Sequence, residues 1–306
     1  MAKPIFVIGK QRSGTTWLGN MLSEHPDLAG IRHDSYFGIR ESMFFSHIYD
    51  RYGDLHEETN FIEFVQVMTM VDYFRLVGAT EEVFFSLKAR KYEDIFRSLM
   101  DRYAEERGCE FWIEKTPMHA LWINKLAQFY PDAKFVAIKR NPDAVVASGL
   151  SRRSSVNMRR RVSISKIVME WTFYNKVIDD FARRFPGRII STTYEELTSE
   201  TESVLVRICI FLGIPYDPIM CNQSFVPNTS FTEGQDRSKA LTSREKKLVR
   251  QVEFSTKFLP LFTLTWLDLI RRKIKRQPSL PESSFKMLQL STEDEQEVSL
   301  APMNPR

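Results

Sequence analysis

The stretch from Ile5 to Thr16 reads IFVIGKQRSGTT, an apolar run that leads into a loop of glycines and polar residues. The ATP-type phosphate-binding loop, G-x-x-x-x-G-K-[ST], places a lysine on the β- and γ-phosphates and a hydroxyl on Mg²⁺. Gly9 and Gly14 keep that spacing, but Thr15 occupies the lysine position. Backbone N–H groups and the N-terminus of a following helix still attract an anion. The loop therefore predicts a phosphate site poorly suited to a metal-bound triphosphate.

A second apolar run, at residues 135–138, ends in a cation and predicts a second anion site. Lys139 and Arg140 follow the run, and Pro142 suits the first turn of a helix. Ser148, eight residues after Arg140, lies about two helical turns on, so both side chains can reach one ligand. Taken alone, Arg140 fits equally well as a solvated residue at the end of a strand.

Together the two motifs resemble those of the P-loop sulfotransferases, which use 3′-phosphoadenosine 5′-phosphosulfate (PAPS). The pattern is closest to bacterial members and to the heparan sulfate and protein-tyrosine branches. The resemblance implies that Arg140 and Ser148 bind the 3′-phosphate, and that Arg152 matches a further phosphate-contacting arginine in part of the family. It also implies that the 5′-phosphosulfate is held by a loop made of Arg12, Ser13, Gly14, Thr15 and Thr16.

Residues 112–119, WIEKTPMH, fit the family pattern W-x-E-K-[TS]-P-x-H. Sulfuryl transfer, like phosphoryl transfer, needs an in-line attack and relief of charge on the leaving oxygen. Positioned cations supply that relief without a metal. The resemblance implies that Arg12 and Lys115 are these catalytic cations, although Lys115 alone also fits a solvated lysine after a strand.

Two shorter segments extend the resemblance. Residues 193–197, TYEEL, resemble the family's Y-E-x-L signature, in which the tyrosine, here Tyr194, lies near the nucleotide. Residues 227–231, PNTSF, resemble a segment of bacterial members whose serine approaches the phosphosulfate. That serine is Ser230, and a surface turn is the alternative interpretation.

A general base must accept the proton of the attacking hydroxyl or amine. In the heparan sulfate branch, the glutamate that acts as the base lies 22 positions after the loop cation. This spacing leads from Arg12 to Asp34. The protein-tyrosine branch places its glutamate one position closer, which leads to His33. Both residues accept protons, so we predict Asp34 as the base and keep His33 as the second candidate.

Composition fits a globular protein of 306 residues, with 43% hydrophobic and 27% charged residues. The formal net charge is only +4, so anion affinity must come from local clusters, and no nucleic-acid partner is predicted. Three scattered cysteines are too few for a disulfide framework or a zinc site, and no metal is expected. One cluster without acidic residues, at 144–169, contains Arg152, Arg153, Arg159, Arg160, Arg161 and Lys166.

Apolar strands that alternate with helical segments predict an α/β protein, a three-layer sandwich of the P-loop NTPase type with a central parallel sheet flanked by helices. Further strands are expected at 110–114 and 188–191, and helices at 119–130 and 201–212. Residues 36–108 have a helical pattern with aromatic side chains that we interpret as core. Because this region matches no motif, we expect it to form the acceptor side.

We expect a single sulfotransferase domain over residues 1–276 and a disordered tail over 277–306, which is polar and rich in proline and acidic residues. The apolar and then basic segment 258–276 is too short to span a bilayer. We favour a helix docked on the domain, with an interfacial membrane helix as the alternative. The first strand begins at Pro4 or Ile5, which leaves no room for a signal peptide, so a cytoplasmic location is expected.

The sequence thus predicts a PAPS-dependent sulfotransferase of class EC 2.8.2. It would transfer a sulfuryl group to a hydroxyl or amine of a small molecule, peptide, glycan or lipid and release 3′-phosphoadenosine 5′-phosphate (PAP). One alternative is a P-loop kinase, which would require Mg²⁺ and a lysine in place of Thr15. Another is a non-enzymatic module that binds anions or a membrane surface through 152–166 and 258–276.

Overall fold

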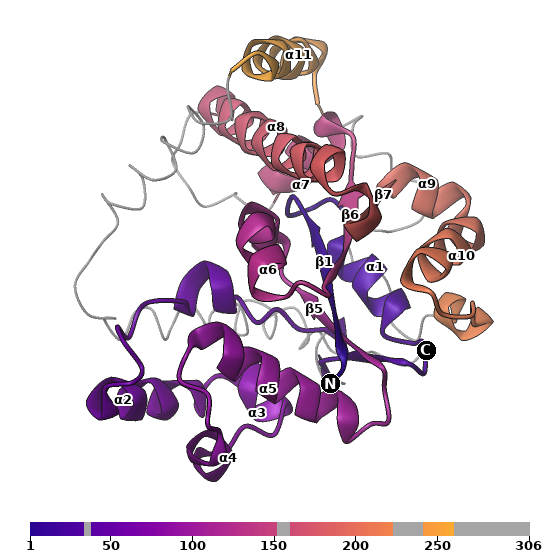
Figure 1. Cartoon of the computed structure of the whole chain (residues 1–306). Coiled ribbons are helices and arrows are strands. Elements are labelled where there is room, and N and C mark those ends of the chain that lie inside the picture. The colour runs from indigo at the N-terminus through magenta and orange to yellow at the C-terminus, as the bar shows by residue number, and fades with distance from the viewer. Residues whose placement is uncertain (34–37, 152–159, 223–240, 260–306) are drawn as a thin grey trace, which may run out of the picture. The chain divides into compact units, whose positions relative to one another are not determined.

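A computed structural model describes residues 1–33, 38–151, 160–222 and 241–259. In these residues a five-stranded sheet lies between layers of helices (Figure 1). All neighbouring strands of this sheet pair in parallel. The three-layer α/β fold predicted from the sequence is therefore confirmed. The strands, in their order across the sheet, are β2 (Leu28–Gly30), β5 (Phe111–Lys115), β1 (Lys3–Gly9), β6 (Lys134–Lys139) and β7 (Ile189–Thr193).

Successive side chains of β1 point to opposite faces of the sheet, as a strand requires. Phe6 and Ile8 enter one hydrophobic cluster, and Ile5 and Val7 enter another; all four are fully buried. Burial on both faces explains why the strand reads as a continuous apolar run. The first face is covered by α5 (Tyr92–Glu105), α6 (Ile123–Phe129) and α8 (Arg160–Arg184), and the second by α1 (Thr15–Leu22), α9 (Tyr194–Ser199) and α10 (Thr201–Leu212).

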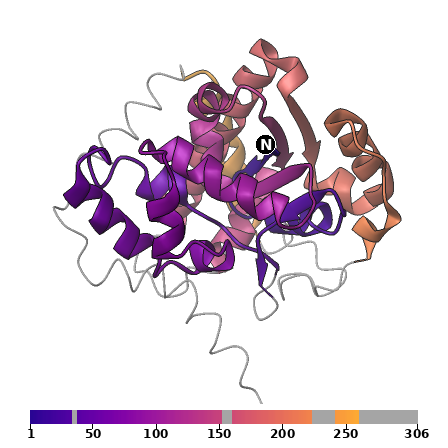
Figure 2. The same cartoon turned by 60° about the horizontal axis from the view of Figure 1, so that its bottom comes forward.

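Residues 44–105 form an aromatic helical region on one flank of the sheet, opposite α9 and α10 (Figure 2). At its centre the rings of Phe44 and Phe96 lie 4.9 Å apart, and both are fully buried. Most aromatic residues expected in the core are buried, but Phe85 is 50% exposed. The elements are a π-helix (Phe44–Ile48), α2 (Glu58–Met68), α3 (Asp72–Leu76), α4 (Glu81–Ser86) and α5.

Element boundaries follow local chemistry. Helix α10 spans Thr201–Leu212 as predicted and ends where Gly213 adopts a left-handed φ of 80°. The helix predicted over 119–130 is divided, because Pro117 opens a 3₁₀ turn (Pro117–Trp122) before α6 begins.

The remaining described helices are α7 (Pro142–Ser151), which follows β6, and α11 (Ser243–Lys257), which packs on α8. None of the described helices has the length and apolar character needed to cross a membrane. Of the predicted terminal helix only Phe258 and Leu259 are described, and both are exposed. The remainder of that segment and the predicted tail lie outside the described residues.

Candidate active site

The predicted phosphate loop connects the end of β1 to the start of α1. A side-chain Cβ at Gly9 would lie 2.4 Å from the carbonyl oxygen of Ile138, so only glycine allows the loop to leave the sheet here. Gly14 has a φ of +99°, and a Cβ there would lie 2.6 Å from Cδ2 of Tyr194. Arg12 also adopts a left-handed φ, of 74°. The backbone of this tight turn lies at the carboxyl edge of the sheet, where parallel α/β folds bind ligands.

The two predicted phosphate sites are joined by direct hydrogen bonds. Arg12 Nε donates to Ser148 Oγ at 2.9 Å, and Arg140 Nη1 donates to the Arg12 carbonyl oxygen at 3.2 Å. Ser148 is 2% exposed on α7, and Trp171 Nε1 donates to the Arg140 carbonyl oxygen at 2.8 Å. The arginine at the end of β6 and the loop after β1 therefore form one cationic surface.

Tyr194 adds an aromatic wall to this surface. A capping box starts α9, in which Thr193 Oγ1 accepts from Glu196 N at 3.0 Å and Glu196 Oε2 accepts from Thr193 N at 2.8 Å. This box places Tyr194 in the first turn of α9, where its ring centre lies 3.9 Å from the guanidinium carbon of Arg140. Burial raises the pKa of the Tyr194 phenol, although the charge of Arg140 opposes the shift.

Lys115 lies at the carboxyl end of β5 and is 2% exposed. Its Nζ donates to Thr16 Oγ1 at 3.2 Å and to Glu41 Oε1 at 2.7 Å. The ammonium group thus stands between the first turn of α1 and a carboxylate from a different segment. It is the second predicted catalytic cation, and the structure places it against the phosphate loop.

Glu41 is a candidate functional residue that the sequence reasoning missed. It follows the short hairpin of β3 (Arg32–His33) and β4 (Gly38–Ile39), and its side chain is 30% exposed. No motif marks it in the sequence. The closeness of Glu41 to Lys115 depends on the pairing of β3 with β4, which turns the chain back. Sequence spacing alone does not reveal this pairing.

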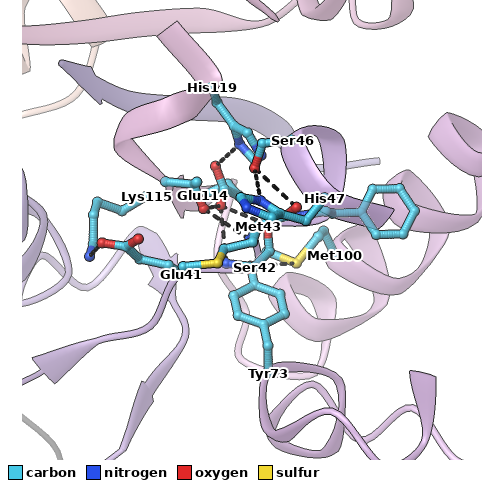
Figure 3. Close-up of polar contacts among 12 residues, drawn as sticks. Glu41, Ser42, Met43, Ser46, His47, Tyr73, Met100, Glu114, Lys115 and His119 are labelled. Carbon is cyan, nitrogen blue, oxygen red and sulfur yellow. Dashed lines mark hydrogen bonds and ion pairs between the residues drawn. The ribbon is translucent and has the colours of Figure 1, made fainter. Parts of the chain in front are cut away.

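A buried polar network lies directly beside the Glu41–Lys115 pair (Figure 3). Glu114 and His119 are both fully buried, and His119 Nδ1 donates to Glu114 Oε2 at 2.6 Å. Glu114 Oε1 accepts from Ser42 Oγ at 2.7 Å and from Thr116 Oγ1 at 2.5 Å. Burial alone would raise the pKa of Glu114, but His119 and the hydroxyl donors reverse this effect and leave the pKa below its ordinary value. The network therefore holds a buried carboxylate in its charged form.

The structure brings most predicted site residues to one edge of the sheet, because the loop after β1 and the ends of β5, β6 and β7 meet there. Ser13 is buried, and its Oγ has no hydrogen-bond partner among the described residues. His33 lies on β3, in the hairpin before Glu41. The other three predicted residues, Asp34, Arg152 and Ser230, lie outside the described residues.

The site has no cluster of metal-ligating side chains among the described residues. These residues contain no group of three or more histidine, cysteine, aspartate or glutamate side chains arranged to hold a metal ion.

Comparison with protein families decides which class of enzyme uses this arrangement. A model described as "Sulfotransferase family" matches residues 4–218. The chain belongs to the sulfotransferase family. The match runs from β1 past the end of α10, and therefore includes the loop, Lys115, Arg140 and Tyr194 of the site. The chain is accordingly a transferase of the sulfotransferase class.

Curated relatives of this sulfotransferase include two nematode proteins. One, named "Putative protein-tyrosine sulfotransferase" from Caenorhabditis briggsae, is 25% identical over 218 residues, which is 71% of this chain and 67% of the relative. A protein of the same name from Caenorhabditis elegans is 28% identical over 106 residues, which is 35% of this chain and 41% of that protein. The second match thus spans less than half of the relative's length.

Solved structures support the fold of the sulfotransferase. The sulfotransferase domain from the Synechococcus PCC 7002 olefin synthase has a TM-score of 0.54 and 22% identity, covering 85% of this chain and 96% of that chain. The sulfotransferase domain from the curacin biosynthetic pathway has a TM-score of 0.51 and 18% identity, covering 79% of this chain and 83% of that chain.

Proposed function

We propose that this sulfotransferase transfers the sulfuryl group of PAPS to an acceptor hydroxyl or amine and releases PAP. The observation that carries the proposal is the hydrogen-bonded link between the phosphate loop and the α7 site, from Arg12 to Ser148 and from Arg140 to Arg12. A donor with phosphate groups on both its 5′ and 3′ positions would engage both sites together. ATP would leave the 3′-phosphate site empty.

The loop side would hold the 5′-phosphosulfate. Arg12 supplies a cation, and the backbone N–H groups that begin α1 supply donors aligned with the helix dipole. The buried Ser13 hydroxyl, which has no partner among the described residues, is a further donor for a bound anion. These groups favour the negative charge that develops on the leaving phosphate.

The α7 side would hold the 3′-phosphate through Arg140 and Ser148, while Tyr194 and Trp17, whose ring centres lie 5.7 Å apart, offer aromatic surface to the adenosine. A charge-assisted hydrogen bond to a phosphate is about twice as strong as a neutral one. Selectivity for PAPS over ATP therefore depends on this side of the site.

Chemically, the acceptor heteroatom forms a bond to sulfur as the bond from sulfur to the 5′-phosphate oxygen breaks, and the electron pair of that bond leaves with PAP. Arg12 and Lys115 would stabilise the charge on the bridging and sulfuryl oxygens. Sequence spacing predicts Asp34 as the base, with His33 as the second candidate.

The nematode relatives carry tyrosine in their names, so a phenolic hydroxyl is the first acceptor to test, followed by small phenols, glycans and lipids. The helical region 36–108 is the proposed acceptor side, and the cytoplasm is the proposed location. Contact with a membrane surface through 258–276 remains the alternative to a docked helix.

Kinase activity is disfavoured by the residues of the loop itself. Thr15 stands where an ATP-type loop has its lysine, and it is 4% exposed in the first turn of α1. A neutral hydroxyl at this position cannot replace an ammonium group on the β- and γ-phosphates. A non-enzymatic module, in turn, would not explain why Lys115 is buried beside the loop.

Isothermal titration in EDTA tests the nucleotide proposal, with PAP, ATP and AMP as ligands. We expect PAP to bind without metal and at least about tenfold more tightly than ATP, because the 3′-phosphate adds a charge-assisted contact. Equal affinity for PAP and ATP would overturn PAPS as the donor. ATP binding that appears only when Mg²⁺ replaces the EDTA, with no PAP binding in either buffer, would favour the kinase.

A further inference from the structure

We infer that Glu41 is the base that accepts the acceptor's proton, and that the buried Glu114–His119 pair holds it in place through Ser42. This inference rests on the proposed sulfuryl transfer and deepens it, because it replaces the predicted base positions with a carboxylate that the sequence spacing does not reach. Glu41 would be a catalytic residue. Ser42, Glu114 and His119 would be positioning residues.

The position of Glu41 follows from its contact with Lys115. Lys115 Nζ bonds Thr16 Oγ1 on one side, next to the loop that would hold the phosphosulfate, and Glu41 Oε1 on the other. A carboxylate 2.7 Å from this ammonium group therefore lies one side chain away from the transferred group. In the described residues Glu41 makes no second polar contact, so its other oxygen is free to accept a proton. Its 30% exposure leaves a path for an acceptor.

Figure 3 shows that Glu41 and Lys115 lie next to the buried network of Ser42, Glu114 and His119. Two residues of the buried network are direct sequence neighbours of this pair: Ser42 follows Glu41, and Glu114 precedes Lys115. The Ser42 hydroxyl donates to Glu114 Oε1 at 2.7 Å, and its backbone N–H donates to the same oxygen at 3.4 Å. One buried carboxylate thus ties the backbone beside the proposed base to the strand that carries the cation.

A second contact in the same place restrains the loop further. Met43 N donates to Thr116 Oγ1 at 3.2 Å, and Met43 adopts a left-handed φ of 49°, which a non-glycine residue adopts only when its surroundings hold it there. Thr116 Oγ1 itself donates to Glu114. The turn that carries Glu41 is therefore fixed from both of the residues that follow it.

His119 completes the set of hydrogen bonds to Glu114. Its Nδ1–H donates to Glu114 Oε2, while its Nε2 is buried without a partner in the described part of the chain. Its ring lies 5.4 Å from the ring of Phe45, in an edge arrangement. A buried carboxylate with three side-chain donors is strongly held, and removing one donor leaves an uncompensated charge. We expect the loop, and Glu41 with it, to move when the network is broken.

The acceptor O–H proton passes to the free oxygen of the Glu41 carboxylate, the acceptor oxygen bonds to sulfur, and the bond between sulfur and the 5′-phosphate oxygen breaks. Lys115 would bridge Glu41 to the transferred group. The products are a sulfate ester, PAP and a protonated Glu41, which returns its proton to solvent.

The first test compares Glu41→Gln, His33→Gln and Asp34→Asn in transfer of ³⁵S from labelled PAPS. The acceptor is the one turned over fastest among a tyrosine-containing peptide, 4-nitrophenol, an oligosaccharide and a long-chain alcohol, with water as the acceptor if none of these reacts. General-base catalysis contributes roughly 100-fold to 10,000-fold, so Glu41→Gln should lower kcat at least about 100-fold. The loss of kcat in His33→Gln and in Asp34→Asn should each be at least about tenfold smaller than the loss in Glu41→Gln.

Binding and rescue separate a lost base from a lost fold. Glu41→Gln should keep its PAP affinity within about twofold, because the groups that hold PAP are on the loop and α7. Glu41→Ala should regain activity in sodium formate, since a small carboxylate can occupy the vacated position. Full activity of Glu41→Gln, or a comparable loss in His33→Gln or Asp34→Asn, would overturn the assignment of the base.

A double-mutant cycle tests whether the buried network acts through Glu41. Ser42→Ala should lower kcat about tenfold in the parent and by less than about twofold in Glu41→Gln, because two residues that act as one unit are not additive. Ser42→Thr keeps the hydroxyl and should restore kcat. An equal loss from Ser42→Ala in both backgrounds, or no loss in the parent, would show that the network does not act through Glu41.

Failure of the proposed function would look different from failure of this inference. A chain that binds no PAP and transfers sulfate to nothing, water included, would overturn the proposed function. A chain that binds PAP and transfers sulfate with Glu41 replaced would leave that function intact and overturn only the role of Glu41.

Discussion

The phosphate loop and the aromatic helical region 44–105 are built by opposite means. In the loop, function depends on a few polar atoms held by hydrogen bonds, as between Arg12 and Ser148. In the helical region, rings such as Phe44 and Phe96 pack over a large apolar area and bring no charge to it. Changes in the first region should therefore affect binding or turnover with little loss of stability, and changes in the second should do the reverse.

The largest expected effect is on the aromatic side. Phe44 is fully buried and lies within ring contact of Phe45, Phe64, Phe74, Tyr92 and Phe96. Phe44→Ala should lower the free energy of unfolding by about 3–5 kcal/mol, because the cavity cannot collapse among packed rings. Urea denaturation measures the loss, and Phe85→Ala, at a half-exposed ring, is the matched control. A strong loss of PAP affinity in folded Phe44→Ala would break the comparison.

The next effect is on the loop side. Lys115→Ala removes the cation between Thr16 and Glu41 and should lower kcat about 100-fold to 1,000-fold, the range for a lost preorganised donor. Steady-state transfer of ³⁵S from labelled PAPS measures it. Lys3→Ala is the control, because Lys3 is an exposed lysine at the opposite, amino end of β1. Similar turnover in the two variants would mean that Lys115 is only structural.

Within the nucleotide site, Arg140→Ala removes the proposed contact to the 3′-phosphate. It should weaken PAP binding by about 1.5–3 kcal/mol, the scale of a hydrogen bond to a charged group. AMP has no 3′-phosphate, so its affinity should change little, and titration of both ligands makes the test internal. An equal loss for both would place Arg140 at the base or ribose and not at the 3′-phosphate.

The smallest expected effect concerns the capping box that positions Tyr194. Thr193→Ala removes one side of the box and should lower stability by about 1 kcal/mol, whereas Thr193→Ser keeps the oxygen and should not. Thermal melts of the two variants measure the difference. Identical melts would show that packing of Tyr194 against Gly14 and Arg140, and not the cap, fixes the start of α9.

The same comparison explains which parts of the site were predictable from sequence. The loop from Gly9 to Thr16 and the run that ends at Arg140 are local, because glycines, a following helix and a strand end fix their geometry within a few residues. Glu41 was missed because its place depends on the β3–β4 hairpin and on contacts of its neighbour Ser42 with Glu114, far along the chain. Spacing from Arg12 carries no information about such a hairpin.

The fold shows the same limit. The parallel sheet and the end of α10 at Gly213 followed from apolar runs and a glycine cap. The division of the predicted helix 119–130 did not, because Pro117 is compatible with both an α-helix start and a 3₁₀ turn, and burial of His119 against Glu114 fits the turn. Exposure of Phe85 likewise depends on how α4 packs, which ring spacing alone does not determine.

The most direct test of the central claim is a dual-label transfer assay in EDTA. The full-length protein is incubated with ³⁵S-labelled PAPS and, separately, with γ-³²P-labelled ATP, in the presence of soluble extract and a tyrosine-containing peptide, and Lys115→Ala serves as the inactive control. We predict a ³⁵S-labelled product that depends on Lys115 and on PAPS, with no ³²P product. Transfer of ³²P, or no transfer of ³⁵S above the Lys115→Ala control, would contradict the account.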